Sequence, residues 1–473
     1  MNPQTPSAGH RLGLLDRARS LSRHRDLERP PGPRDPTGLW NAVRLSAGTL
    51  ELLRELADTY GDVVHFKLLG SDYYLLNNPH DIEDVLARQA QAMARDEYIG
   101  TLARTLGNGL LTRDGELWRR QRKLMAQAFT PRRIRDYGET MVAVTDRALQ
   151  SGLDHRGGEV VNLHATMSGI TMEVVAAVLF GAAISSEQVE LVAATMETLN
   201  EYYANSPEVL LMLPSWVPTP LNRRVNAAVE RLDAVIYSII AQRRRAAEPR
   251  HDLLDTLLTA LDEGGAGMSD QQLRDEVTTL FLAGHETTAL ALAHTIYLLA
   301  KHPQIERRLV AELDEVLGGR LPTVEDAAAL RYTRQVIDEA MRLYPPAWTT
   351  GREVVREVEI AGYRIPPGAQ VLTSQWVVHR DPRFFPDPEA FDPDRWLPER
   401  AKLLPRYAYF PFGGGPRVCI GNHFALLEAT LVLAVLMQRH HFELLPGQTL
   451  ALTPSVTLRQ KGPGLRVRVR RRY

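Results

Sequence analysis

The chain of 473 residues carries 56 lysines and arginines against 57 aspartates and glutamates, a formal net charge of −1. A balance so close to neutral argues against nucleic acid as a partner. The single cysteine excludes an internal disulfide framework. No run of 18 apolar residues occurs, so the sequence predicts no transmembrane anchor.

Residues 1–29 are arginine-rich and lack the long apolar centre of a secretory signal, so we expect a mobile basic arm. The alternative is a membrane-surface or targeting arm, because the leucines between Leu12 and Leu21 could line one face of a helix. No linker rich in proline, glycine and serine interrupts the rest, which predicts one domain over 30–473. Arginine far outnumbers lysine, as in proteins of GC-rich bacteria, and the cytoplasm is the expected location.

The pattern of apolar residues predicts a mainly α protein with small β-sheets. An amphipathic helix over 46–60 precedes two β-rich runs, 63–69 and 73–77, that predict a hairpin. Helical periodicity then predicts helices over 114–129, 137–152, 163–180, 186–204, 223–248, 270–301, 303–317 and 331–344. Short strands are expected near 352–363, 451–457 and 465–470. The last run alternates arginine with apolar residues, so its arginines should form one solvated face.

The centre of the predicted helix over 270–301 carries residues suited to proton transfer. A mid-helix glycine, Gly284, costs about 1 kcal/mol against alanine, so something should compensate. Thr287 could donate to the carbonyl of Ala283 and open the helix there. Glu286 beside it supplies an acid next to an alcohol, the groups that deliver protons in general acid catalysis. A zinc-protease reading of the same segment fails, because Ala289 stands where a second histidine is needed.

The only cysteine, Cys419, follows a glycine-rich segment and precedes an apolar helical stretch over 424–437. A thiolate at a helix N-terminus is stabilised by the helix dipole, so we expect its pKa to fall. Such a sulfur can be an axial ligand to haem iron, whereas a lone buried cysteine is otherwise a small hydrophobe. Gly413 and Gly415 would let the backbone approach a flat ligand, and Arg417 could pair with an acidic group on it.

The segment Phe412-Gly-Gly-Gly-Pro-Arg-Val-Cys-Ile-Gly421 resembles the haem-binding loop of the cytochrome P450 superfamily. The resemblance covers 30–473 and implies a large helical domain with small sheets. Haem b would lie between the distal helix over 270–301 and the Cys419 loop and helix. The segment Ala283-Gly-His-Glu-Thr287 matches the family's acid–alcohol motif, which makes Glu286 and Thr287 the implied catalytic residues.

The same resemblance implies supporting residues around the haem. Expected cofactor-binding residues are Trp118, Arg122, Ala283, Gly284, Arg352, Phe412, Gly413, Arg417, Cys419 and Gly421, with Cys419 as the iron ligand. Three of these arginines, Arg122, Arg352 and Arg417, would hold the haem propionates. Glu339 and Arg342 resemble the family's buried Glu-x-x-Arg pair, with Arg395 as a third, structural partner. Trp396 stands where the family often has phenylalanine.

The residues expected to contact substrate, by analogy with the family, are mostly apolar or small. They are Tyr98, Leu102, Leu280, Phe281, Ala283, Thr288, Ala347, Trp348, Thr349 and Val456. An apolar lining implies a hydrophobic substrate positioned by shape, which leaves fatty acids, terpenoids, carotenoids and polyketides open. The proline-rich segment 213–221 looks like a lid loop.

The resemblance implies a haem-thiolate monooxygenase that uses O₂ as co-substrate and hydroxylates a hydrophobic compound. The sequence shows no flavin or iron–sulfur segment, so electrons should come from a separate donor, a ferredoxin or flavodoxin with its reductase. Arg119, Arg120 and Lys123 could form its docking patch or simply a solvated face. Two alternatives stay open: a peroxide-using haem peroxygenase or isomerase, and a non-catalytic haem-binding or electron-carrier protein.

Overall fold

The structure is a computed structural model. It describes residues 29–155, 158–181, 186–203, 206, 208, 213–245, 250, 252–462 and 464–472. The expected basic arm over 1–29 lies, apart from its last residue, outside the described residues. The prediction of one domain over 30–473 stays a prediction.

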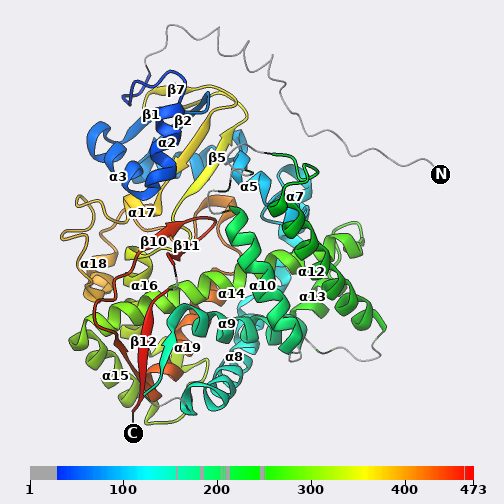
Figure 1. Ribbon diagram of the computed structural model, residues 1–473, viewed down its shortest axis with the longest axis vertical. Helices are drawn as coiled ribbons and strands as arrows, with labels where there is room; N and C mark the ends of the chain where they lie inside the picture. Colours follow the sequence, from blue (N-terminus) through cyan, green and yellow to red (C-terminus); the bar gives the residue numbers. More distant parts are fainter. Residues whose placement is uncertain are drawn as a thin grey trace.

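A long central helix, α14 (Asp270–Lys301), crosses the lower half of the molecule in Figure 1. It packs against α9 (Leu163–Phe180), α12 (Pro220–Arg245), α16 (Arg331–Leu343) and α19 (Asn422–Arg439). Apolar residues surround most of its circumference, as expected of a helix enclosed by others. Ser269 and Gln272 form a capping box that fixes where it begins.

The remaining helices surround this centre. The longer ones are α2 (Leu39–Ala47), α3 (Thr49–Tyr60), α7 (Gly115–Ala126), α8 (Pro131–Ser151), α10 (Ser186–Tyr203), α13 (Leu253–Thr259) and α15 (Pro303–Leu317). The short ones are α4 (Pro79–Glu83), α5 (Glu97–Thr101), α6 (Ala103–Leu106), α17 (Gln375–Val378) and α18 (Pro398–Ala401). The helix predicted over 46–60 is confirmed as α3, although it begins three residues later, because Gly48 separates it from α2, which was not predicted.

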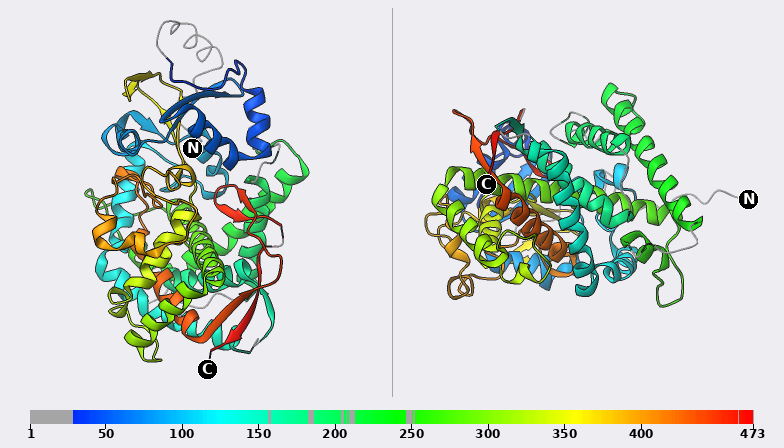
Figure 2. Two further views of the ribbon diagram at one scale, coloured as in Figure 1. Left: turned by 90° about the vertical axis from the view of Figure 1, so that its left-hand side faces the viewer. Right: turned by 90° about the horizontal axis from the view of Figure 1, so that it is seen from below.

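Four small sheets complete the fold. The largest has the strand order β1 (Val63–Leu68), β2 (Ser71–Leu76), β8 (Gln370–Thr373), β5 (Thr350–Val354) and β3 (Met93–Ala94). Another joins β4 (Val160–Asn162), β12 (Arg466–Arg471) and β9 (His440–Leu444). Two hairpins are β6 (Val358–Ile360) with β7 (Tyr363–Ile365), and β10 (Leu452–Pro454) with β11 (Leu458–Gln460). The largest sheet lies with α2 and α3 at one end of the molecule, and most helices gather at the other (Figures 1 and 2).

Several sequence expectations are confirmed by this architecture. The β1–β2 hairpin pairs Val63 with Leu76, as the two β-rich runs predicted. In β12 the alternate valines Val467 and Val469 are buried, while the arginines between them are exposed. The fold is mainly helical with small sheets, as predicted.

Among the described residues, α9 alone is long and apolar enough to cross a membrane, judged by length and composition. However, 61% of it is buried inside the protein, and it packs against α14 and α8. These contacts are those of a core helix.

Candidate active site

A mostly apolar cavity of about 330 Å³ is bounded by α14 on one side and by the cysteine loop and α19 on the other. Fourteen of the predicted site residues line it: Trp118, Arg122, Leu280, Ala283, Gly284, Thr287, Thr288, Ala347, Arg352, Phe412, Gly413, Arg417, Cys419 and Gly421. The structure therefore brings together motifs that lie up to about 300 residues apart in the sequence.

The cysteine loop is held by backbone hydrogen bonds. The Cys419 N–H donates to the Phe412 carbonyl at 3.0 Å, and the Gly415 N–H donates to the Tyr407 hydroxyl at 3.1 Å. Gly415 has φ +64°, and a Cβ there would lie 1.8 Å from the Leu86 carbonyl oxygen. This glycine is needed for packing against the Leu86 backbone, which differs from the expected approach to a flat ligand.

The Cys419 thiol is surrounded by protein but stays accessible through the cavity that it lines. Burial raises the pKa of Cys419 above its ordinary value, although the Gly421 N–H and the Arg122 charge oppose this. The expected lowering was wrong for the free thiol, because α19 begins only at Asn422 and desolvation outweighs its dipole. Metal coordination deprotonates a thiol outright, so a raised pKa does not prevent ligation.

Arg417 is fixed at the edge of the cavity. Its guanidinium lies 4.2 Å from the centre of the Trp118 ring and forms an ion pair with Asp114. It also donates to the Arg113 carbonyl at 2.9 Å. Its Nη1 is buried and has no hydrogen-bond partner within the described parts of the chain. One donor of Arg417 is therefore left for a ligand.

Four arginines converge on this cavity, and Arg95 is the one that sequence reasoning missed, because it stands in no motif. Burial lowers the pKa of Arg95 well below its ordinary value, and repulsion from Arg352 and Arg417 adds to the effect. Burial likewise lowers the pKa of Arg122 and Arg352. Buried cations need anionic partners, so a flat apolar ligand with two carboxylates fits this site. Haem has this chemistry, and the residues present fit it.

The motif on α14 places its acid and its alcohol on different sides of the helix. The Thr287 hydroxyl donates to the Ala283 carbonyl at 2.8 Å, the bond expected from the sequence, and lines the apolar cavity. Glu286 and His285 instead line a second, polar cavity. Successive side chains of an α-helix point about 100° apart, which explains the separation.

The residues around Glu286 stabilise its ionised form. Burial alone would raise the pKa of Glu286, but His164, Arg459 and His285 together lower it to about 2. The sequence analysis missed His164 and Arg459, because they come from distant segments and form no motif with Glu286.

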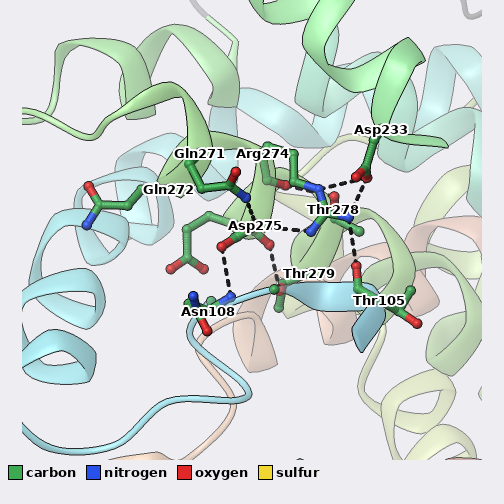
Figure 3. Close-up of polar contacts among 12 residues, drawn as sticks. Thr105, Asn108, Asp233, Gln271, Gln272, Arg274, Asp275, Thr278 and Thr279 are labelled. Atoms are coloured by element: carbon green, nitrogen blue, oxygen red, sulfur yellow. Dashed lines mark hydrogen bonds and ion pairs between the residues drawn. The ribbon is translucent and has the colours of Figure 1, made fainter. Parts of the chain in front are cut away.

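The loop between α6 and α7 is fastened to α14 by a polar cluster (Figure 3). Asp275 accepts from the Asn108 N–H at 2.8 Å, and Arg274 pairs with both Asp275 and Asp233. One residue further along α14, Glu276 accepts from the Leu110 N–H at 3.0 Å. Leu110 lines the apolar cavity, so this cluster fixes one of its walls.

Six of the ten expected substrate residues do not line the apolar cavity. The Tyr98 hydroxyl donates to the Tyr203 carbonyl, Trp348 Nε1 to the Ser455 carbonyl and Thr349 to the Thr373 carbonyl. Phe281 packs on Phe180 and His285, Leu102 belongs to the main core, and Val456 is partly buried against that core. The cavity is also lined by apolar residues that were not expected: Leu110, Leu111, Val175, Val178 and Leu179.

In the segment expected to be a lid, residues 213–219 form a loop that leads into α12.

Glu339, Arg342 and Arg395 meet in one buried cluster. The Arg342 guanidinium pairs with the Glu339 carboxylate at 2.8 Å, and Arg395 Nε lies 3.2 Å from it. Trp396 Nε1 donates to Glu339 at 3.0 Å, so the departure from the family's phenylalanine adds a hydrogen bond. Arg342 also donates to the His379 carbonyl, and the His379 ring accepts from the Phe410 N–H just before the cysteine loop. The cluster is thereby connected to that loop.

The expected docking patch is partly neutralised within the protein. Arg120 pairs with Asp262 at 2.6 Å, and Lys123 pairs with Glu263. Among the described residues, Arg119 makes no ion pair, so it contributes most of the patch's remaining charge.

Comparison with known proteins gives a consistent result. A family model described as cytochrome P450 matches residues 30–465. Cyclooctatin synthase of Streptomyces melanosporofaciens is 38% identical over 423 residues, which cover 88% of this chain and 91% of that protein. Pentalenene oxygenase of Streptomyces avermitilis is 34% identical over 383 residues, covering 80% and 84%. The crystal structure of the cytochrome P450DA haem domain matches with a TM-score of 0.83 at 26% identity, over 95% of this chain and 99% of that one.

In this structure a thiol faces a long helix across an apolar cavity, and arginines line the edge of that cavity. This arrangement is typical of a haem-thiolate protein. The chain belongs to the cytochrome P450 family. Another relative is cyclooctat-9-en-7-ol 5-monooxygenase of S. melanosporofaciens, 37% identical over 87% of this chain and 89% of that protein. The chain is thus a haem-binding oxidoreductase of the P450 monooxygenase type.

Proposed function

We propose that this P450 hydroxylates a terpenoid, a largely apolar cyclic compound of the kind that its relatives' names denote. The observation that carries the proposal is the apolar cavity, whose wall between α14 and α9 is formed by aliphatic side chains with few polar groups. Haem b is the proposed cofactor. Electrons would come from a ferredoxin or flavodoxin with its reductase, and the cytoplasm is the proposed location.

Haem held by Cys419 would supply the activation of O₂ that inserts one oxygen atom into a C–H bond of the substrate and releases the other as water. This reaction takes up two electrons and two protons. The protein's own residues bind the propionates through arginines, exclude water with the apolar wall, and present the Thr287 hydroxyl beside the Ala283 carbonyl. Glu286 is the acid nearest to Thr287 in sequence.

The Glu286–Thr287 pair favours oxygen activation over the two alternatives. A peroxide-using peroxygenase or isomerase receives its protons with the peroxide and has no need of an acid–alcohol pair. A non-catalytic haem carrier has no need of an apolar cavity in front of the distal helix.

Replacing Thr287 with alanine should uncouple the enzyme, because the hydroxyl that passes protons into the oxygen site is lost. We expect electron consumption to continue at a similar rate while peroxide replaces most of the product. The measurement is product and peroxide formed per NAD(P)H oxidised, with Thr287→Ser as the control that keeps the hydroxyl. Full coupling in Thr287→Ala would contradict the proposed role.

An optical titration of the ferric holoenzyme tests the substrate class. Cyclic terpenes and terpene alcohols should displace water from the iron and shift the spectrum from low to high spin. Fatty acids serve as the comparison. A shift with fatty acids and none with terpenes would replace the terpenoid proposal with a fatty-acid one.

A further inference from the structure

A fully buried acid, Glu428, lies on α19, the helix that begins just after Cys419. Within the described part of the chain, neither of its carboxyl oxygens has a hydrogen-bond partner. A buried carboxylate without a partner is costly, so such a group normally changes its protonation state instead. Glu428 is therefore an unusual residue to find between the cysteine loop and the distal helix.

The polar group beside Glu428 is the hydroxyl of Thr288 on α14, which packs against α19. Thr288 lines the apolar cavity, and its hydroxyl donates to the Gly284 carbonyl at 3.0 Å. A hydroxyl has a single proton to donate, so towards Glu428 the Thr288 oxygen can only accept. An ionised carboxylate can only accept as well. The two groups can therefore form a hydrogen bond only when Glu428 is protonated.

The surroundings of Glu428 favour this protonated form. Burial raises the pKa of Glu428 from its ordinary 4.5 to about 8, and only the Thr288 hydroxyl opposes the rise. The described helix α8 carries no buried charged side chain. The buried acids of the other helices packed against α19 are bonded elsewhere: Glu276 to Leu110, Asp275 to Arg274, Glu286 to Arg459, Glu306 to Arg472 and Glu339 to Arg342. The histidines of α14 contact other rings: His285 that of Phe281 and His294 that of Tyr344.

We propose that Glu428 is a positioning residue of the oxygen site, which in its neutral form donates to the Thr288 hydroxyl and keeps that hydroxyl bonded to the Gly284 carbonyl. A threonine that bonds back to a carbonyl one turn earlier bends its helix. Thr287 and Thr288 do this to the adjacent carbonyls of Ala283 and Gly284, which line the cavity. The neutral acid thus holds the local shape of α14 where O₂ would bind.

Loss of the proton from Glu428 reverses this arrangement. The ionised carboxylate would accept the Thr288 proton, and the Gly284 carbonyl would lose the hydroxyl bond. One proton passes to solvent, and no other atom is transferred. The inference rests on the proposed function where it concerns coupling, because only a turning-over enzyme divides electrons between product and peroxide. The protonation state itself can be measured without turnover.

Infrared spectra of the ferric holoenzyme give the first readout. A protonated-acid band of Glu428 should be present at about pH 7 and should fade with a midpoint near 8 as the pH is raised. Glu428→Gln should lack this band, and difference spectra against that variant assign it. Glu399→Gln, at an exposed site in α18, is the matched control and should keep the band. Identical spectra in the wild type and Glu428→Gln would overturn the proposal.

Unfolding measurements test the same protonation state independently. Between pH 4.5 and about 8, the unfolded chain has released the Glu428 proton while the folded protein keeps it. The stability of the wild type should therefore fall, relative to that of Glu428→Gln, as the pH rises through this window. Above it the difference should stay constant. A difference that does not change with pH would show that Glu428 is already ionised, against the proposal.

Coupling tests the positioning role. In the wild type, product formed per electron should fall about tenfold from about pH 7 to about pH 9, in step with the neutral fraction of Glu428. Glu428→Gln still donates to Thr288 and cannot ionise, so it should rescue coupling at the higher pH. Glu428→Leu lacks the donor and should be poorly coupled already at the lower pH. An equal fall with pH in the wild type and Glu428→Gln would overturn the role.

A double variant shows whether Glu428 acts through Thr288. Adding Glu428→Leu to Thr288→Val should lower coupling no further than Thr288→Val alone. Additive losses would overturn the proposal. A wild-type enzyme that oxygenates none of the tested substrates would instead overturn the proposed function, and the infrared and unfolding results would still decide the protonation state of Glu428.

Discussion

Cys419→Ala should abolish oxygenation, because no other described side chain can supply a thiolate to the haem. The reduced CO complex should lose the spectrum typical of thiolate ligation, and product formation should fall to the level of free haem. The chain should still fold, since Cys419 faces the cavity and the loop is held by the hydrogen bonds of its backbone. Circular dichroism and haem content measured on the same sample separate lost chemistry from lost structure.

Two further variants sharpen this result. Cys419→Ser keeps the size of the side chain and should be equally inactive, whereas Gly100→Ala, at an exposed position outside the cavity with room for a methyl group, should keep the thiolate spectrum. Oxygenation by Cys419→Ala at a rate near that of the wild type would contradict the assignment of the iron ligand.

Glu339→Gln should lower the free energy of unfolding by about 3–5 kcal/mol, the usual effect of removing one partner of a buried ion pair. Arg342 is fully buried and donates to Glu339 through two nitrogens, so neutral glutamine leaves its charge uncompensated. The Arg395 and Trp396 donors also lose a charged acceptor. Denaturant unfolding of the holoenzyme measures the change.

The Glu339→Gln change should also weaken the binding of haem, because the cluster is linked through His379 to the backbone before the cysteine loop. We expect faster transfer of haem from Glu339→Gln to an acceptor protein. Glu315→Gln, on the exposed face of α15, is the control and should change stability by less than about 0.5 kcal/mol. A similar small change in Glu339→Gln would show that the cluster does not support the site.

The sequence could predict those elements whose signals are local. The bounds of α14, α9 and α15 match the predicted ranges, because these long helical runs are closed by caps such as Ser269. The start of α8 was placed six residues late, at 137 instead of Pro131, although Thr130 and Pro131 form a recognisable N-terminus. The break at Gly48 was missed because apolar spacing continues across it.

The site residues also fall into those with a local sequence signal and those without one. Short motifs located Cys419, Thr287 and the Glu339–Arg342 pair, since their members are neighbours in sequence. The contacts of Glu286 with Arg459 and of Asp275 with Asn108 join segments more than 160 residues apart. No local pattern encodes such contacts, because they arise only when α14 packs against its neighbours.

Because Cys419 is the only cysteine of the chain, its chemical reactivity shows whether the protein has bound haem. A thiol reagent can label only Cys419, and iron bound to the sulfur blocks the reaction, so the labelled fraction equals the fraction without haem. Intermolecular disulfides can likewise form only between haem-free molecules. A band of disulfide-linked dimer on a non-reducing gel therefore shows that a preparation contains molecules without haem.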